Sequence, residues 1–489
     1  QAFVGCSNMQ KFEASNLEAV GNAAFKGCSV LNTFTVQNPM KNIGAEAFYG
    51  TGLQEFNVTN SVAEIGPGAF AECQELTKLS FSPGPHTNSC IIDKFAFYNC
   101  PKLRDVSWGD NNNNVKSLGY AAFAMQAGGD SLEEFKFPEI KEEKDLGDYV
   151  LAGHSNLKKV TMPSVNFGRY TDVKLPSGLF MDCVSLEQVI FPDDGSYSCG
   201  SIRFDADLFY EVTNPDFYVR GPEQKRQNNA FSEADPRVST WDALSIAHDG
   251  KTGIPYVYNR NGTDYFEICQ NNMIMLIDGK GNLSSCSFHP KVKTQADKDK
   301  LAGELVIPAE VAGTTVKTVA KGSFGDGNEP NDIKKYIKKL TFPDDGELAT
   351  IEEGVFEGCP KLEKVVIGNT MKNIGANAFA NCGTNIDAPS SVVLEVVFHS
   401  PKDGDYAGFK IGQNAFTTGG EPLIFSGDIV KGYAPFEHAM DPGTKITEDG
   451  LRVCYKSLSP QNLIVMQNNS ENGTGETNAP TLVDYPHYE

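Results

Sequence analysis

Large apolar residues recur along the chain at intervals that begin at 22 or 23 residues and widen to between 26 and 29. Most are followed by a run of the form Leu-x-x-apolar-x-apolar, and polar segments fill the wider intervals. Self-similarity at this period predicts short units that stack on one another and share one core. The recurring residues are Phe3, Phe25, Phe48, Phe70, Phe97, Phe123, Leu151, Phe180, Phe209, Phe324, Phe356, Phe379 and Phe416.

One repeat, residues 65–81 with the sequence IGPGAFAECQELTKLSF, shows what each unit is expected to form. Leu79 and Phe81 are two residues apart, so a short strand places both on the face that is buried. Gly66 allows a tight corner, and Phe70 enters the interior through a turn or a single helical turn. Such a unit cannot bury its own apolar side chains. Stacking does so, with about 1.5–3 kcal/mol for each large one.

Seven of the twelve cysteines stand three residues after the recurring Phe. This position predicts an interior ladder of free thiols that act as small hydrophobic side chains. Neighbouring ladder thiols fall within the spacing that a disulfide tolerates, so disulfides are the alternative, and a bond between Cys269 and Cys286 is then the favoured one. The predicted core ladder comprises Cys6, Cys28, Cys73, Cys100, Cys183, Cys359 and Cys382.

The register of the repeats is interrupted between Phe209 and Phe324. Part of this interval lacks periodicity. The other part alternates apolar and polar residues around the turn signal DGKGN, which predicts antiparallel strands that cap the exposed edge of a second array. The predicted organisation is a repeat array at 1–220, a linker at 221–254, a β-hairpin cap and the start of the second array at 255–320, a second repeat array at 321–426, and a terminal cap with a flexible exit at 427–489.

The repeats IGAEAFYGTGLQEFNV, IGPGAFAECQELTKLSF, IEEGVFEGCPKLEKVVI and IGANAFANC resemble the BspA-like leucine-rich repeats of bacterial surface proteins. The shared pattern is I-G-x-x-A-F-x-x-C-x-x-L-x-x-V-x-apolar-P, and the match covers roughly residues 1–220 and 300–426. The resemblance implies a mainly β, right-handed leucine-rich-repeat solenoid with short helical turns, here in two arrays. It also implies a protein displayed on or secreted from cells as an adhesin or receptor for host proteins, other bacteria or glycans. It supplies no catalytic residue.

Charge and motif spacing exclude several classes of function. The net charge of −21 leaves no basic surface to neutralise phosphates, which excludes nucleic acids as main partners and favours a soluble monomer. No two cysteines lie closer than ten residues, so the C-x-x-C element of a zinc site is absent, and no run approaches the length of a membrane span. Nucleotide-binding and nucleophile-elbow motifs also fail on spacing. We therefore expect no enzyme activity, no cofactor and no metal.

The residues just before and between the two apolar positions of each strand are expected to point outward. In the first array this row is polar and mixed in charge, and its last strand contributes Asp216 and Tyr218. An apolar strip that begins at Ile190 is a possible contact surface, although strand propensity also explains exposed Val. The candidate binding face comprises Lys159, Thr161, Gln188, Ile190, Tyr218, Lys364, Val366 and Val397.

The sequence thus predicts a non-enzymatic bacterial protein, extracellular or on the cell surface, that binds a macromolecule and above all a host protein. Glycan recognition is an alternative, and it predicts exposed aromatic side chains at inserted loops near Trp108, Tyr197 or Trp241. A structural spacer that displays another domain is a third possibility. Neither end of the chain shows a sorting signal, and both are expected to be cut from a longer protein.

Overall fold

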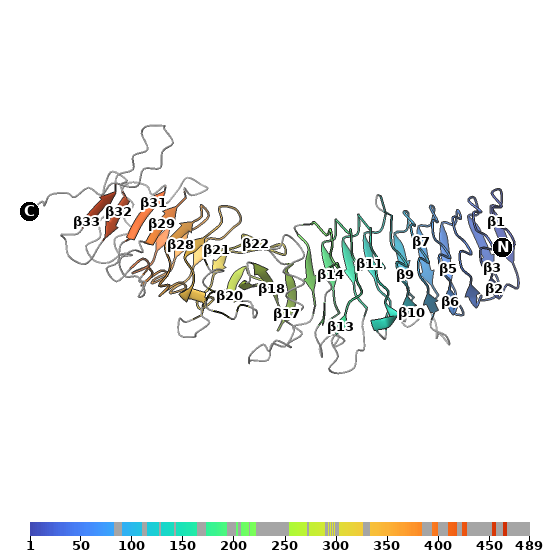
Figure 1. The fold of residues 1–489 in the computed structure, drawn as a ribbon, viewed down its shortest axis with the longest axis horizontal. Helices are drawn as coiled ribbons and strands as arrows, with labels where there is room; N and C mark the ends of the chain where they lie inside the picture. The colour runs from blue at the N-terminus through green and yellow to red at the C-terminus, as the bar shows by residue number, and fades with distance from the viewer. Residues whose placement is uncertain are drawn as a thin grey trace, which may run out of the picture. The chain divides into compact units, whose positions relative to one another are not determined.

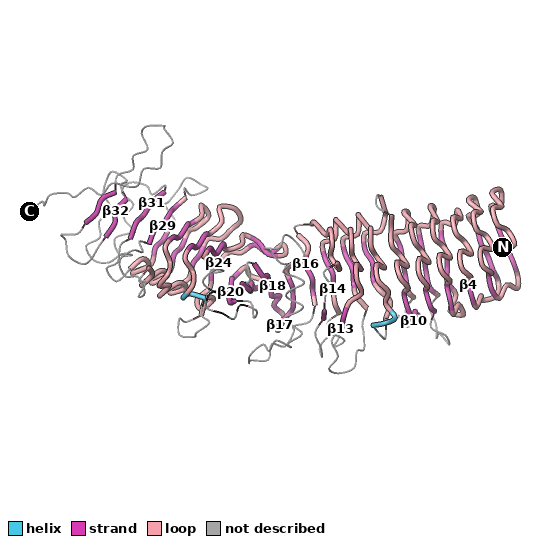
Figure 2. The backbone as a smooth tube through the Cα atoms, viewed as in Figure 1, coloured by secondary structure: helices cyan, strands magenta, loops and turns pink. Residues whose placement is uncertain are grey.

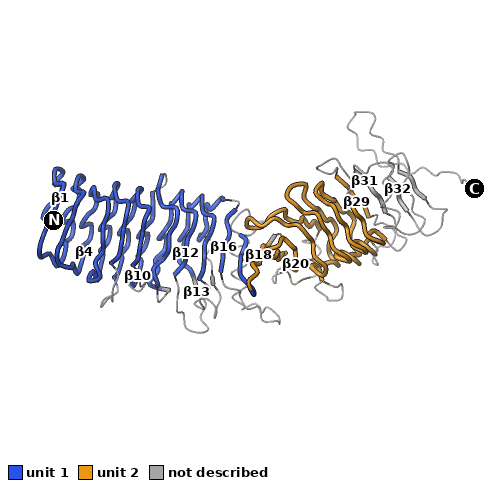
Figure 3. Tube along the Cα trace, turned by 180° about the vertical axis from the view of Figure 1, so that it is seen from behind, with its two compact units in different colours: residues 1–261 blue, residues 262–489 orange. Residues whose placement is uncertain are grey.

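The computed structural model divides into two compact units, unit 1 at residues 1–261 and unit 2 at residues 262–489 (Figure 3). Residues 222–253 of the predicted linker and most of the predicted exit lie outside the described residues. The structure describes residues 1–221 and 254–417, except 83–89, 110–114, 127–128, 141–142, 164–172, 193–201, 204–206, 215, 271–272, 289–291, 293, 295, 297, 299–302, 326–332, 384–393 and 400–408, together with 423–427, 452–455 and 463–466.

Unit 1 contains two rows of short parallel strands joined by turns (Figures 1 and 2). The first row is formed by the Leu-x-x-apolar-x-apolar runs, and in β7 it buries Leu79 and Phe81 as the alternation predicts. The strands of this row are β1 (Lys11–Ala14), β3 (Thr33–Val36), β5 (Glu55–Val58), β7 (Lys78–Phe81), β9 (Asp105–Ser107), β11 (Glu134–Lys136), β12 (Lys159–Thr161), β14 (Gln188–Ile190) and β16 (Tyr218–Arg220), followed by β17 (Tyr256–Arg260).

The second row is formed by the Ile-Gly segments that precede each recurring Phe. Its strands pair in parallel, and one three-residue 3-10 helix, η1 (Glu143–Asp145), lies in the same unit. The strands are β2 (Ala19–Val20), β4 (Asn42–Ile43), β6 (Glu64–Ile65), β8 (Cys90–Ile92), β10 (Val115–Leu118), β13 (Val173–Lys174) and β15 (Ile202–Arg203).

The recurring phenylalanines form a stacked spine inside unit 1. From Phe25 to Phe123 the centroids of successive rings are 5.0 to 5.4 Å apart and their planes differ by no more than 14°. This spacing is close to the separation of adjacent strands, so equivalent residues stack in register. Leu151 is fully buried in the same position, and Phe180 then stacks on Phe209. The predicted shared core is confirmed.

A ladder of main-chain hydrogen bonds connects the turns of successive repeats. In the second repeat the N–H groups of Ala23, Phe25 and Gly27 each donate, at 2.8 Å, to a carbonyl of the following turn. We call this set the turn ladder. Residues two before and two after the recurring Phe commonly adopt a left-handed conformation, as Ala23 and Gly27 do. Donors from alternate residues therefore all point toward the next repeat.

The glycine of the Ile-Gly pair is required for close approach and not for an unusual backbone angle. A Cβ on Gly66 would lie 2.8 Å from the main-chain nitrogen of Ala45 in the preceding repeat, and one on Gly119 would lie 2.4 Å from that of Lys94. Neither glycine has a positive φ. The expectation that Gly66 serves a tight corner is therefore replaced by one of contact between neighbouring backbones.

Unit 2 begins with three antiparallel strands, as the alternation predicts. The last of them pairs in parallel with β24, the first strand of the short row that follows. The strands occupy the edge that a cap would cover, and the capping role stays a prediction. The three strands are β18 (Thr263–Gln270), β19 (Met273–Asp278) and β20 (Asn282–Phe288).

The remainder of unit 2 repeats the architecture of unit 1. Phe356 and Phe379 stack at 5.2 Å, and Phe379 and Phe416 stack at 5.4 Å. The two parallel rows are β21 (Glu304–Val306), β25 (Lys339–Thr341), β27 (Lys364–Ile367), β29 (Leu394–Phe398) and β31 (Leu423–Gly427), and β24 (Thr318–Val319), β26 (Thr350–Ile351), β28 (Asn373–Ile374) and β30 (Lys410–Ile411). Smaller elements are β22 (Glu310–Val311), β23 (Thr314–Thr315), η2 (Ile333–Lys335), β32 (Arg452–Tyr455) and β33 (Leu463–Met466).

The disulfide alternative is wrong for Cys269 and Cys286. Cys269 on β18 lies opposite Ile274, and Cys286 on β20 lies opposite Met275, so that β19 separates the two thiols. No disulfide joins any of the cysteines that the structure describes.

We expect Gly66→Ala to lower the free energy of unfolding by about 1–3 kcal/mol, because the added methyl group forces two stacked backbones apart. Gly21 holds the equivalent place in an earlier repeat, and a Cβ there meets nothing within 4 Å. Gly21→Ala is therefore the matched control and should leave stability unchanged. Urea unfolding of the full chain, followed by circular dichroism, measures both. Equal shifts in the two variants would contradict the close-approach explanation.

Candidate functional site

The structure brings five of the predicted binding residues together on adjacent strands of unit 1. Lys159 and Thr161 on β12 lie beside Gln188 and Ile190 on β14, and Tyr218 on β16 lies beside Gln188. All five side chains are half-buried. The Gln188 Nε2 group donates a hydrogen bond of 2.6 Å to the Tyr218 hydroxyl oxygen. We call the outward residues of β12, β14 and β16 the strand face.

The register of β16 is shifted by two residues from the expected one. Tyr218 pairs with Gln188, and Arg220 pairs with Ile190, whereas the sequence pattern placed Asp216 and Tyr218 in these positions. Tyr218 therefore takes the place expected for Asp216, and Arg220 takes the place expected for Tyr218. The residues of β16 that pair with Gln188 and Ile190 thus include a guanidinium group and no carboxylate. Arg and Tyr are the residues that most often anchor protein interfaces, so the corrected face is better suited to binding a protein than the predicted one.

Most charged residues in the outward row are neutralised by a neighbour in the next repeat. Lys78 lies 3.5 Å from Asp105, and Lys159 lies 4.0 Å from Glu134. Exposed pairs of this kind contribute about 0–1 kcal/mol to stability, but they reduce the charge that the row presents to a partner. On β14 and β16 the row changes to Gln188, Ile190, Tyr218 and Arg220. Only Arg220 among these four residues is charged.

The other three predicted residues lie in unit 2 on two adjacent strands. Lys364 lies beside Glu395, with 2.9 Å between Nζ and Oε2, and Val366 lies beside Val397. Lys364 and Val397 are half-buried, but only 9% of Val366 is exposed. The expectation that Val366 lies open on this face is wrong. Strand alternation determines which side a residue faces, and it does not determine how much its surroundings cover it.

The cysteine ladder is buried, and its thiols make a contact that the sequence did not indicate. Cys28 Sγ donates to the Phe3 carbonyl at 3.0 Å, Cys100 Sγ to that of Phe70 at 3.2 Å, and Cys183 Sγ to that of Leu151 at 3.2 Å. Burial raises the pKa of the Cys28, Cys100 and Cys183 thiols, so each keeps its proton and can donate it. Cys6, in the first repeat, is only half-buried.

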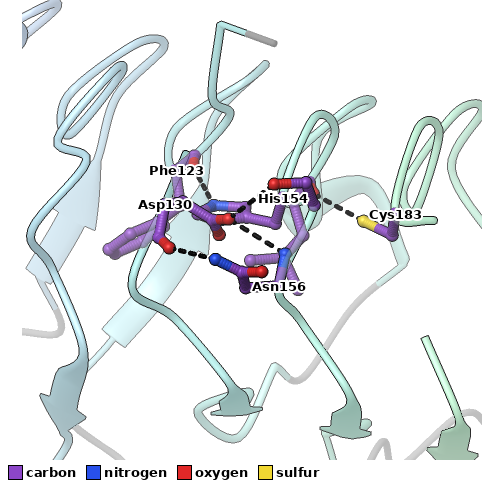
Figure 4. Close-up of polar contacts among 7 residues, drawn as sticks. Phe123, Asp130, His154, Asn156 and Cys183 are labelled. Atoms are coloured by element: carbon purple, nitrogen blue, oxygen red, sulfur yellow. Dashed lines mark hydrogen bonds and ion pairs between the residues drawn. The ribbon is translucent and has the colours of Figure 1, made fainter. Parts of the chain in front are cut away.

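His154 replaces a cysteine of this ladder and forms a buried ion pair (Figure 4). Its Nε2 lies 2.7 Å from the Phe123 carbonyl oxygen, and its Nδ1 lies 2.5 Å from Asp130 Oδ2. The side chains of His154 and Asp130 are 3% and 2% exposed. Both neighbours of the ring are acceptors, so the contact is fully satisfied when both ring nitrogens carry a proton. The imidazole therefore spans the space between one turn and its neighbour.

Further hydrogen bonds hold the Asp130 carboxylate in place. Ser155 Oγ and the Asn156 N–H donate to its Oδ1 at 3.1 and 2.9 Å, as Figure 4 shows for Asn156. Burial by itself would raise the pKa of Asp130. The hydrogen bond and charge of His154, with the donors of Asn156 and Ser155, outweigh it and lower that pKa below its usual value. The pair is almost completely buried, which favours a structural role over contact with a substrate.

Exposed aromatic side chains lie on the turns rather than on the strand face. Phe95 and Tyr120 are 37% and 46% exposed, and their ring centroids are 5.4 Å apart. The glycan alternative placed such residues near Trp108, but Trp108 is buried and packs against Phe81 in the core. The other two positions named for that alternative lie outside the described residues.

Neither a metal-binding cluster nor a membrane-spanning helix occurs among the described residues. They contain no group of three or more His, Cys, Asp or Glu side chains arranged to hold a metal ion. Within the same residues, no helix is long and apolar enough to cross a membrane.

Stacked short strands, a buried Phe spine and a cysteine ladder define a leucine-rich-repeat solenoid. The pattern described as the BspA type leucine rich repeat region matches six copies in this sequence, over residues 1–126, 85–206 and 333–394. These matches cover more than half of the chain, which therefore belongs to the BspA-type leucine-rich repeat family.

Several solved structures resemble the chain at low identity. A leucine-rich repeat protein from Bacteroides ovatus is 17% identical over 84% of this chain and 85% of its own, with a TM-score of 0.27. A leucine rich cell surface protein from Faecalibacterium prausnitzii is 16% identical over 90% and 96%, with a TM-score of 0.22. The pneumococcal vaccine antigen PcpA is 14% identical over 89% and 78%, with a TM-score of 0.19. No curated protein matches the chain.

We predict that His154→Cys, although it restores the residue typical of the ladder, lowers the free energy of unfolding by about 3–5 kcal/mol, because it leaves the Asp130 carboxylate buried without its charged partner. Thermal or urea unfolding of the full chain measures the loss. The double variant Asp130→Asn/His154→Cys should recover part of it. If the single variant is as stable as the native chain, the pair does not hold these turns together.

The same pair makes stability depend on pH in the acid range. Because the pKa of Asp130 is lowered in the folded state, its carboxylate stabilises the fold fully above the ordinary Asp pKa of about 4. This contribution is lost as the pH falls through the lower folded-state value. The stability difference between the native chain and Asp130→Asn should therefore narrow below about pH 4. Urea unfolding at a series of pH values tests this, and a difference that widens toward low pH would refute it.

Proposed function

We propose that this protein is a non-enzymatic repeat protein that is displayed on or secreted from a bacterial cell and mediates adhesion by binding a host protein. Membership of the BspA-type repeat family supports binding through the repeats. The strand face supports a protein as the ligand, because Tyr218, Arg220 and Ile190 combine an aromatic, a guanidinium and an aliphatic group on neighbouring strands.

The observation that carries this proposal is the change in character of the outward row between β12 and β14. β7 and β9 share an ion pair, as do β11 and β12, whereas β14 and β16 present Gln188, Ile190, Tyr218 and Arg220. Of these four residues only Arg220 is charged, so a partner that covers them removes one charged group from water and the desolvation cost is low. The corresponding surface of unit 2 is weaker as a candidate because Val366 is covered.

The test uses the full chain and a panel of immobilised extracellular proteins, fibronectin, fibrinogen, laminin and collagen, with binding measured by surface plasmon resonance. For a panel member that binds, Tyr218→Ala and Ile190→Ser should each weaken the affinity roughly tenfold, as expected for residues at the centre of an interface. Thr33→Ala and Thr35→Ala, on the same row at β3, are the matched controls and should leave it unchanged.

Other results would point to the alternatives. Equal affinities for all four variants would remove the strand face as the binding surface. If no panel protein binds and deletion of the first array changes no binding to host cells, the chain acts as a spacer that displays another domain.

A further inference from the structure

Phe95, Tyr120 and Tyr149 form a row across three consecutive turns of unit 1, which we call the aromatic row. The Phe95 and Tyr120 ring centroids are 5.4 Å apart, and those of Tyr120 and Tyr149 are 5.5 Å apart. Tyr98 packs edge-on against Phe95 at 5.6 Å. Phe95 and Tyr120 are exposed, and Tyr98 and Tyr149 are partly so. The row is distinct from the strand face because it follows β8 and β10 in the other row of strands.

The backbone fixes the spacing of the aromatic row before any ligand arrives. The Phe95 N–H donates to the Tyr120 carbonyl at 2.9 Å, and the Tyr149 N–H donates to the Ser177 carbonyl at 3.0 Å, both within the turn ladder. A Cβ on Gly178 would lie 2.2 Å from Tyr149 Cε1, so the Tyr149 ring rests directly on the glycine backbone of the next turn. The rings are therefore held as a preorganised surface.

The turn ladder explains the left-handed conformation at this position, but it does not explain why a bulky aromatic residue occupies the position in two repeats. Phe95 and Tyr149 both have φ of 59°, at the left-handed position two residues before the recurring core residue. Other repeats place non-aromatic residues there, among them Ala23, Glu46, Gly68, Ala121, Gly178, Gly354, Asn377 and Asn414. A bulky aromatic residue in this region is strained, and Phe95 is exposed rather than buried in the core. Strain retained without burial is characteristic of functional positions.

The surroundings of the row indicate the chemistry of its ligand. Asp93 and Asp148 lie two residues before Phe95 and one before Tyr149, and each accepts one main-chain hydrogen bond, from Lys94 and Ser177. Their remaining carboxylate oxygen and the tyrosine hydroxyls can bond to the hydroxyl groups of a sugar, whose C–H faces pack on aromatic rings. Because the row is only one aromatic ring wide, it matches a linear chain of sugar rings better than it matches the broad surface of a protein. The carboxylates and the net charge of −21 disfavour an acidic polymer.

We propose that the aromatic row is a binding site for a linear, uncharged polysaccharide. Successive sugar rings pack along Phe95, Tyr120 and Tyr149, and Asp93 and Asp148 accept hydrogen bonds from their hydroxyl groups. This site lies apart from the strand face and adds a second ligand class to the proposed function.

The test is affinity electrophoresis of the full chain in native gels that contain β-glucan, galactomannan or arabinoxylan, with polygalacturonate as the charged counterpart. At least one neutral polymer should retard the native chain. Phe95→Asn, Tyr149→Asn and Tyr120→Ser should each raise the apparent Kd about tenfold. The Tm of the two Asn variants should be unchanged or higher, because Asn accepts the left-handed conformation. Tyr210→Ser removes a tyrosine that is 50% exposed outside the row, and it is the matched control.

Retardation by a neutral polymer that weakens in the three row variants, but not in Tyr210→Ser or Tyr218→Ala, supports the site. Tyr218 belongs to the strand face, so Tyr218→Ala tests the proposed protein binding and should not affect polysaccharide binding. The two proposals can therefore fail independently. No retardation by any neutral polymer overturns the proposal, as does retardation by polygalacturonate alone. Loss of binding to a panel protein in Tyr120→Ser, with no effect on any polysaccharide, would assign the row to a protein partner instead.

Discussion

The structure depends on the close, in-register contact between the turns of neighbouring repeats. Three N–H groups in a turn donate to the carbonyls of the next turn, as Ala23, Phe25 and Gly27 do. This contact places the Phe rings one above another and brings the backbones so close that only glycine fits at positions such as Gly66 and Gly119. A single repeat could bury neither its Phe nor its turn carbonyls, so the contact supplies both the core and the hydrogen bonds.

Much of the fold could be predicted from the sequence because the repeat signals are local and recur. The Phe marks lie in the spine, with the Phe324 ring tilted by 45° against Phe356, and Leu151 occupies the equivalent place. The register of β16 could not be predicted. Residues 216, 218 and 220 all share one face of the strand, so a period of two identifies the face but not the step along it. The burial of Val366 could not be predicted either, because it depends on neighbouring residues that the strand pattern does not include.

The candidate sites were harder to predict because they combine residues from different turns. Asp130 and His154 are 24 positions apart, and only the stack brings them to 2.5 Å. A His in the cysteine slot was the one available signal, and it gave no indication of its acid partner. The aromatic row was missed for a similar reason. Phe95 and Tyr149 occupy turn positions, and the apolar alternation of a β-strand does not mark such positions.

The turn ladder also has a direction, because every donor points toward the following repeat. Within the turns, each repeat therefore presents donors to the following repeat and acceptors to the preceding one, whereas N–H groups next to the short strands, such as those of Gly44 and Gly66, donate to the preceding repeat. Removal or duplication of one whole repeat leaves this polarity intact. Repeats of unequal length also keep it, since the Phe48 N–H donates to the Ala69 carbonyl and the Phe70 N–H to that of Ala96, both at 2.7 Å. Unequal recombination between repeats can thus change the number of repeats without changing how their cores pack.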